Sequence, residues 1–165
     1  MPIYMKYGDK ITGEVTETKH RGWLACDSAS FGGARSTTVE VGSGQEKRHR
    51  DQPTVSDLRV SRTYDKSSPL LFNECVVGKP QKCVIHYLEP ADGADASPNV
   101  YLEYQLRNCL ISSYQVGGGS DGASETLAIN FTAININYTA YDKEDVPTTT
   151  KGAFDLVTAK QTPWK

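Results

Sequence analysis

The chain of 165 residues fits one domain with a hydrophobic core of its own. Its 18 basic and 20 acidic residues give a formal net charge of −2, so the composition gives no reason to expect bulk attraction to nucleic acid or to an anionic membrane. The apolar runs are only a few residues long, which excludes a transmembrane helix. The first ten residues lack a basic region followed by an apolar core, so we expect no Sec-type signal peptide.

The predicted elements are almost all strands. Alternation of apolar and polar residues predicts strands over 3–7, 23–31, 58–64, 82–89, 100–116, 127–138 and 154–158, with a weaker one over 11–15. The strand over 100–116 has the cleanest pattern, with apolar residues at most even positions, and the glycine-rich residues 117–122 then turn the chain back.

The return strand changes face part of the way along. Leu127, Ile129 and Phe131 stand at odd positions, whereas Ile134 and Ile136 stand at even ones. Such a change implies a bulge, or a strand that bends from one sheet to another. The pattern therefore predicts a strongly curved antiparallel sheet.

One helix is predicted, over 65–79. Ser67 or Ser68 is expected to cap its N-terminus, and Gly78 is expected to end it in the left-handed conformation. A helix this short is marginal alone, so it must pack on the strands. Its predicted contact surface is an apolar stripe of two i,i+4 pairs, Leu71 with Cys75 and Phe72 with Val76.

Residues 32–53 show almost no hydrophobic pattern, which in a compact domain indicates a functional or disordered loop. The loop contains a short alternating piece, 37–41, and a basic cluster, 47–50, that has no interleaved aromatic residues typical of nucleic-acid binding. We expect this loop to be an arm that covers a sheet edge of a neighbouring copy. The interface residues predicted in it are Arg35, Thr37, Val39, Val41, Lys47, Arg48 and Arg50.

Few residues point to catalysis. The sequence has no GxSxG elbow and no phosphate-binding glycine loop, so we expect no enzyme, no catalytic residue and no cofactor. A small hydrolase with a site at His86 and Glu125, beside the turn that contains Asp121, is the alternative from another class. The pattern favours the interpretation of Glu125 and Asp121 as solvated residues of that turn. The cysteines at 26, 75, 83 and 109 lack paired spacing, which predicts free thiols and no metal site.

Several stretches together resemble one family. Residues 65–72 (DKSSPLLF), 101–116 (YLEYQLRNCLISSYQV), 117–131 (GGGSDGASETLAINF) and 134–142 (ININYTAYD) closely resemble the Hcp proteins, tube-forming components of bacterial type VI secretion systems. The likeness covers essentially the whole chain. It implies a single domain over 1–165, an antiparallel two-sheet β-barrel with one short flanking helix.

The resemblance also implies an assembly and its partners. Copies of the chain would form hexameric rings that stack into a tube inside a contractile sheath, capped by a spike protein, with secreted effectors in the lumen. The protein would be made in the cytoplasm and secreted without a cleaved signal peptide. It would not insert into a membrane, and nucleic acid would not be among its partners. A phage tail-tube protein is the alternative within the same structural class.

The resemblance points to one further residue. In the family, an aromatic-Ser-aromatic-Gly pattern follows the second strand near the lumen. Here the corresponding residues are Ala29, Ser30, Phe31 and Gly32, which match the pattern except at Ala29. The resemblance therefore implies a lumen or cargo contact at Ser30.

Overall fold

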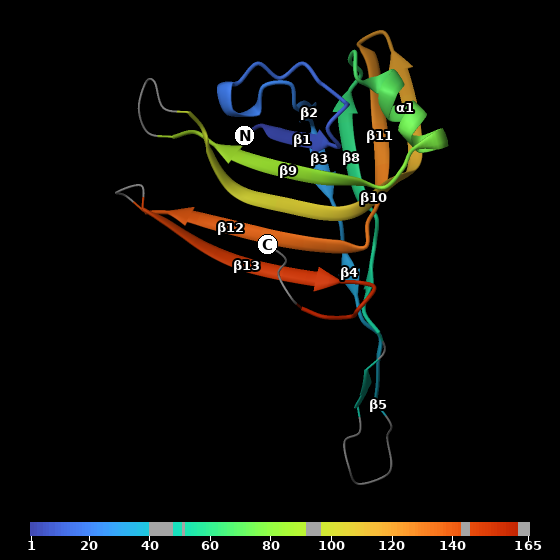
Figure 1. Ribbon diagram of the computed structural model, residues 1–165, viewed down its shortest axis with the longest axis vertical. Coiled ribbons are helices and arrows are strands. Elements are labelled where there is room, and N and C mark those ends of the chain that lie inside the picture. The colour runs from blue at the N-terminus through green and yellow to red at the C-terminus, as the bar shows by residue number, and fades with distance from the viewer. Residues whose placement is uncertain (40–47, 51, 92–96, 143–145, 162–165) are drawn as a thin grey trace.

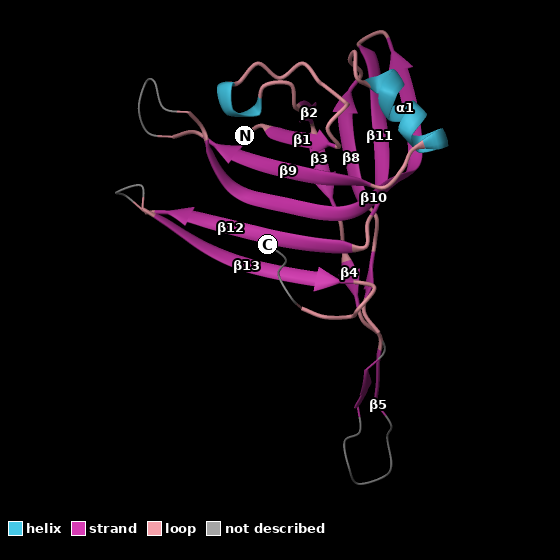
Figure 2. Ribbon diagram, in the orientation of Figure 1, coloured by secondary structure: helices cyan, strands magenta, loops and turns pink. Residues whose placement is uncertain are grey.

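The computed structural model in Figure 1 describes residues 1–39, 48–50, 52–91, 97–142 and 146–161. Figure 2 shows that strands dominate it and that α1 is its longest helix. In chain order the elements are β1 (Ile3–Tyr7), the 3-10 helix η1 (Thr18–His20), β2 (Leu24–Cys26), β3 (Ser28–Ser30), β4 (Gly33–Ala34), β5 (Thr37–Val39), β6 (Arg48–Arg50), β7 (Thr54–Val55), β8 (Leu58–Thr63), α1 (Ser68–Val77), β9 (Gln81–Glu89), β10 (Asn99–Gly119), β11 (Gly122–Asn130), β12 (Ala133–Tyr141) and β13 (Pro147–Asp155).

The strands form two antiparallel layers that cross at a steep angle (Figure 1). The first layer contains β2, β1, β9, the first half of β10, β12 and β13; the second contains the second half of β10, β11, β8 and β3. The backbone N–H of Asp27 donates to the carbonyl of Ser61 (2.8 Å), so β2 and β3 continue each other across a bend. Pairing runs in the order β2, β1, β9, β10, β11, β8 and β3, and the bend at Asp27 joins β2 to β3 through the chain, which gives a barrel-like fold of two layers. The predicted fold class is confirmed.

The hydrophobic core lies between the two layers. Met5, Leu24 and Ile85 enter it from the first layer, and Val60 and Leu127 enter it from the second, all with no exposed surface. Each of these residues alternates along its strand with more exposed neighbours, because successive side chains of a strand point to opposite faces.

The long strand β10 belongs to both layers because it changes face. Its even-numbered residues face the core up to Leu106, but Cys109 and Ile111 are buried beyond a kink at Asn108, whose φ is +50°. A second irregularity follows between residues 111 and 113. The even-numbered pattern predicted for this strand therefore does not hold for burial beyond the kink, where Leu110 is 39% exposed. The predicted change of face on the return strand is confirmed, since β11 ends at residue 130 and β12 begins at 133 in the other layer.

Three strand predictions needed correction. The strand predicted over 23–31 is interrupted at Asp27, and the last strand lies at Pro147–Asp155 rather than at 154–158. Residues 11–15 form no strand; they fold back on residues 22–23, and Gly13 donates its N–H to the carbonyl of Gly22 (2.8 Å). A Cβ at Gly13 would lie 2.3 Å from the Trp23 carbonyl oxygen, so the close approach requires glycine there.

The helix α1 follows β8 as predicted, but its ends are built differently. Ser67 is the N-cap residue, as predicted, but its side chain makes no capping hydrogen bond; its backbone N–H donates to the carboxylate of Asp65 (2.8 Å). Gly78 is extended, with φ −67°, instead of left-handed. Glycine is required there for space, since a Cβ would lie 2.1 Å from the Glu74 carbonyl oxygen.

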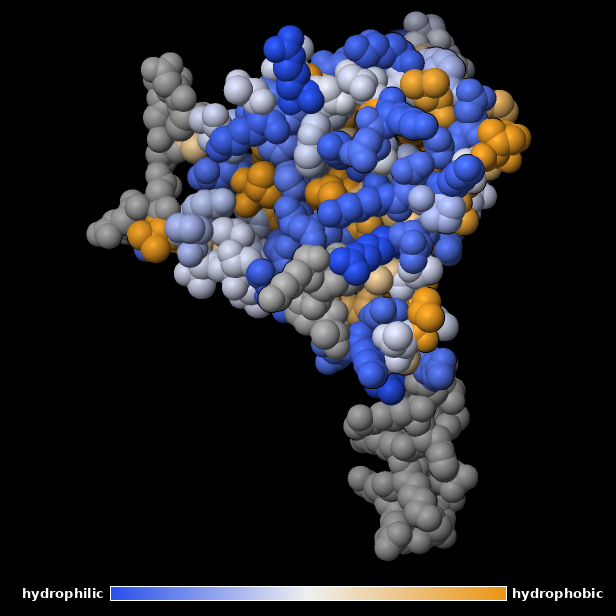
Figure 3. Space-filling model, viewed as in Figure 1, coloured by the Kyte–Doolittle hydropathy of each residue, from blue (hydrophilic) through white to orange (hydrophobic). Residues whose placement is uncertain are grey.

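Only part of the predicted helix stripe is buried. Leu71 is fully buried and Cys75 is half-buried, whereas Phe72 and Val76 are 50% and 63% exposed. The helix lies against β10 along one line of contact, which leaves the second i,i+4 pair outside. Figure 3 accordingly shows hydrophobic atoms at the surface in the corner where Figure 1 places α1. Within the described residues, no helix has the length and apolar character needed to cross a membrane.

Candidate functional site

The predicted interface loop is a hairpin arm. Strand β4 pairs with β7 at its base, and β5 pairs with β6 further out, so that the arm extends well away from the two layers (Figure 1). At the base, Gly32 donates its N–H to Ser56 Oγ (2.8 Å), and Ser56 donates its own N–H to the Gly32 carbonyl (2.8 Å).

The structure adds strand pairing within the arm to this prediction. Thr37 and Val39 pair with Arg50 and Arg48 of the same arm through backbone hydrogen bonds, which need no hydrophobic pattern. Arg35 is exposed between the two paired sections. The remaining predicted interface residues, Val41 and Lys47, lie outside the described residues.

Ser30 lies on a surface of small polar side chains that we term the serine face. Ser30 is exposed on β3, opposite Arg59 of β8. The serine face is the outward side of the second layer, and besides Ser30 and Arg59 it comprises Ser28, Ser61, Thr63, Ser113, Gln115, Ser124 and Thr126. Ser28 Oγ and Ser61 Oγ are hydrogen-bonded at 2.8 Å. Hydroxyl and amide groups therefore dominate this surface, and Arg59 supplies a positive charge.

A buried ionic network lies on the inward side of the same strands. The guanidinium of Arg62 contacts Glu125 Oε1 and Asp65 Oδ2, each at 2.5 Å, and it also donates to Ser67 Oγ (3.1 Å). Tyr114 donates its hydroxyl to the other oxygen of Glu125 (2.6 Å). Arg62 and Glu125 are each 1% exposed, so these contacts replace the water that both charges lost on folding.

This network explains the Asp-Lys-Ser-Ser-Pro entry to the helix. Asp65 bonds both Arg62 and Ser67, so the same carboxylate pairs a buried charge and fixes the first turn of α1. Burial alone would raise the pKa of Asp65, but the hydrogen bonds from Ser67 and Arg62 outweigh burial and lower the pKa below its ordinary value. Burial and the neighbouring Glu125 raise the pKa of Tyr114.

We expect Asp65→Asn to make the protein less sensitive to acid. Because the pKa of Asp65 is lower in the folded than in the unfolded chain, its ionised form stabilises the fold fully above about pH 4. That contribution is lost as the pH falls through the folded-state pKa. Melting temperatures measured between pH 7 and pH 2 should therefore fall less steeply for Asp65→Asn than for the wild type. Asp121→Asn, at an exposed turn, is the control and should keep the wild-type slope.

The residues of the alternative hydrolase site are not brought together. Glu125 was predicted to be a solvated turn residue near Asp121, but it is buried and paired with Arg62. His86 faces the outward side of the first layer, where it contacts Glu103 (2.8 Å) and His20 (2.8 Å). All four cysteines are free thiols, and no group of three or more histidine, cysteine or acidic residues in the described ranges is arranged to hold a metal.

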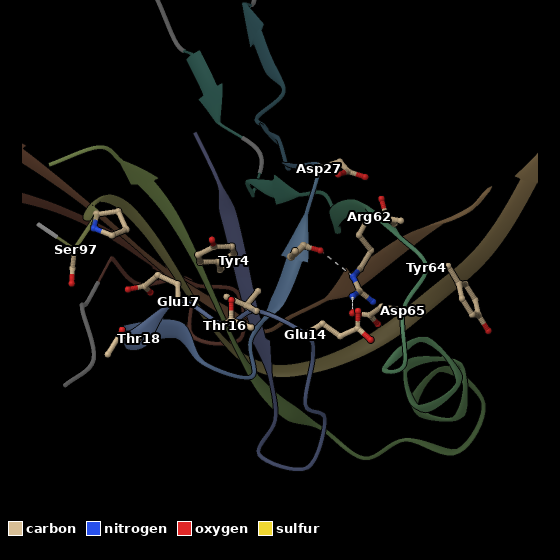
Figure 4. A pocket seen from close by; sticks show the side chains of 14 residues that line it. Tyr4, Glu14, Thr16, Glu17, Thr18, Asp27, Arg62, Tyr64, Asp65 and Ser97 are labelled. Atoms are coloured by element: carbon tan, nitrogen blue, oxygen red, sulfur yellow. Dashed lines mark hydrogen bonds and ion pairs between the residues drawn. The ribbon is translucent and has the colours of Figure 1, made fainter. Parts of the chain in front are cut away.

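One cavity opens beside the ionic network (Figure 4). It has a volume of about 740 Å³ and is lined by residues 14–18, by Tyr4 and Ala25 of the first layer, and by Arg62 and Asp65. Arg62 is held by Asp65 and Glu125, so its charge is not available to a ligand. The sequence pattern pointed to none of these residues as a cavity wall, because the wall joins segments far apart in the chain.

Comparisons with known proteins agree on one family. The family model described as "Type VI secretion system effector, Hcp" matches residues 4–138. Protein hcp1 of Pseudomonas aeruginosa is 31% identical over 86 residues, a match that spans 51% of this chain and 52% of that protein. The chain therefore matches about half the length of that relative.

Solved structures agree with the fold. A structure titled as a type six secretion system protein superposes with a TM-score of 0.81 at 23% identity, covering 98% of this chain and 99% of that one. Hcp1 from Salmonella typhimurium superposes with a TM-score of 0.77 at 22% identity, covering 98% of each chain. The family match favours the secretion-system interpretation over the phage tail tube, and the chain belongs to the Hcp family of type VI secretion system proteins.

Proposed function

We propose that copies of this chain form hexameric rings that stack into the inner tube of a type VI secretion system. The observation that carries the proposal, beside family membership, is the hairpin arm. A two-stranded hairpin standing away from its own domain is marginally stable in water. Packing against a neighbouring copy would bury the arm and cover an open sheet edge at the same time.

The sheet edges offer a place for such contacts. Within the described strands, β13 pairs with β12 alone, apart from a bridge between Asp155 and Lys160 near its end. An unpaired strand edge presents backbone N–H and C=O groups to a neighbour. In a closed ring each copy would contribute an arm and accept one, in a head-to-tail contact.

The serine face is our proposed lining of the tube lumen. Hydroxyl groups exchange hydrogen bonds with water and with any polar protein surface, and they offer little apolar area for tight adhesion. A lining of this kind would hold a passing effector weakly and release it. Ser30 would then contact cargo, and the spike protein and the contractile sheath would be partners of the assembled tube.

Replacing residues 35–50 by a short Gly-Ser linker tests the assembly. We expect a folded barrel that no longer forms rings, because the replacement removes the arm and leaves both layers intact. Light scattering coupled to size exclusion would report the mass, and circular dichroism the fold. Charge pairs at an exposed rim contribute only about 0–1 kcal/mol each, so neutralising Arg48 and Arg50 alone should weaken rings much less.

Three outcomes would contradict this account. Intact hexamers after the replacement would mean that the arm serves another contact, such as stacking between rings. Complete loss of the β-sheet signal would mean that the arm belongs to the folding core. A wild-type protein that stays monomeric under all conditions would refute the ring itself.

A further inference from the structure

Four ionisable side chains form a continuous chain on the outward side of the first layer. Glu17 Oε2 lies 2.5 Å from His20 Nδ1, His20 Nε2 lies 2.8 Å from His86 Nδ1, and His86 Nε2 lies 2.8 Å from Glu103 Oε2. Glu17 caps η1, whereas His86 and Glu103 are opposite residues of β9 and β10. The chain thus joins residues 11–23 to the sheet.

We propose that His20 and His86 bind one added proton from solvent and share it between them, and that this proton clamps residues 11–23 onto the sheet. The proposal goes beyond tube formation and concerns each copy by itself. It rests on a count of protons, because each of the three contacts requires one.

Two neutral imidazoles supply only two protons. If these face Glu17 and Glu103, the two inner ring nitrogens, His20 Nε2 and His86 Nδ1, meet at 2.8 Å with a lone pair each, which is repulsive. If one proton moves between the rings, one carboxylate faces a lone pair instead. All three contacts are hydrogen bonds only when a third proton is present.

The third proton belongs on the rings rather than on a carboxylate. A hydrogen bond from His86 lowers the pKa of Glu103. The Glu103 carboxylate also accepts hydrogen bonds from the side-chain amides of Gln105 and Asn137. Burial would raise the pKa of Glu17, but hydrogen bonds from the Lys19 backbone and from His20 outweigh burial and lower it. Both carboxylates are therefore held in the ionised form, and the imidazole pair carries the charge.

The surroundings favour an imidazolium. The ring of Trp23 lies 4.8 Å from that of His20 and 4.7 Å from that of His86, and Tyr4 of β1 lies 5.3 Å from His20. Electron-rich aromatic rings attract a cation at such distances. On the strands beyond Glu103, Asn137 of β12 lies opposite Glu103, and Lys151 of β13 lies opposite Asn137. The Lys151 side chain is exposed.

The clamp has a structural consequence for the cavity shown in Figure 4. Residues 14–18 form one of its walls, and Glu17 belongs both to that wall and to the proton-binding chain. Loss of the proton at high pH would place two lone pairs together at His20, which is only 2% exposed. We expect residues 11–23 to detach from the sheet under those conditions and the cavity to open.

The number of ring protons is directly measurable. In histidine-labelled protein at pH 8, long-range ¹H–¹⁵N spectra should show three ring protons on His20 and His86 together, against two for a pair of neutral imidazoles. Unfolding at that pH should release about one proton, so the folding equilibrium constant should fall by up to about tenfold per pH unit as the pH rises.

His86→Leu should abolish this dependence on pH, because His20 then keeps one contact, to Glu17, which a neutral imidazole satisfies. His49→Leu should leave the dependence unchanged. Two ring protons on the native pair at pH 8 would overturn the proposal, whatever the variants show. A slope that persists in His86→Leu would overturn it as well. The spectra use the wild-type chain, so the result does not depend on whether the variant folds.

Discussion

Replacing Arg62 by alanine is expected to lower the free energy of unfolding by about 3–5 kcal/mol. The substitution removes the cation that neutralises Glu125, whose side chain has no exposed surface, and one of the two groups that hold Asp65. A buried carboxylate that loses its cation is costly, because its remaining donor, the Tyr114 hydroxyl, carries no charge. Chemical denaturation followed by circular dichroism would give the value.

Arg59→Ala is the matched control. Arg59 stands three residues earlier on the same strand but faces outward and is exposed, so its loss should change stability by no more than about 0.5 kcal/mol. Replacing Arg62 and Glu125 together by leucine should recover part of the loss, since the fully buried charge of Glu125 is removed with its partner and only Asp65 loses its cation. Equal stability of Arg62→Ala and Arg59→Ala would show that the network contributes nothing.

The ionic network connects the helix to the proposed lumen surface. Arg62 is flanked on β8 by Ser61 and Thr63, which belong to the serine face on the opposite side of the strand. If the loss of Arg62 changes the position of β8, the serine face would therefore shift as well. We expect defects in the network to impair tube assembly indirectly, through the positions of β8 and β11.

Alternating hydrophobicity was enough to predict most strands but not the buried charges. The pattern that places Leu58 and Val60 in the core also places Arg62 there, yet a charged residue in a strand is ordinarily read as exposed. Glu125 was assigned to a solvated turn for the same reason. The alternation itself could have identified Arg62 and Glu125. Applied to charged residues as well as apolar ones, it places both on the inward face of their strands, where opposite charges can pair.

Other features depend on contacts that a local pattern does not contain. His20 and His86 are 66 residues apart, and only the folding of residues 11–23 over β1 and β9 brings them together. The arm pairs through its backbone, so the short alternating piece at 37–41 indicated one strand, but the polar composition gave no indication of its partner at 48–50. Ser30 came from the family resemblance, and the structure adds that it lies among other small polar side chains.

Replacing Leu71 by alanine is the second large effect that we expect, a loss of about 2–5 kcal/mol in the free energy of unfolding. Leu71 is the fully buried apolar residue of α1, and the helix is too short to be stable without the contact it makes with the strands. The truncation would remove that contact and leave a cavity beside β10. Thermal and chemical unfolding would both measure the loss.

Val76→Ala separates burial from a general weakening of the helix. Val76 is 63% exposed, and alanine favours a helix more than valine does, so this variant should be as stable as the wild type or slightly more stable. If both variants lost the same stability, helix propensity rather than packing would hold α1 in place. If neither variant lost stability, the contact of Leu71 with the core would not be needed to hold the helix. The exposed apolar side of α1 would then be expected to act through contacts in the assembled tube.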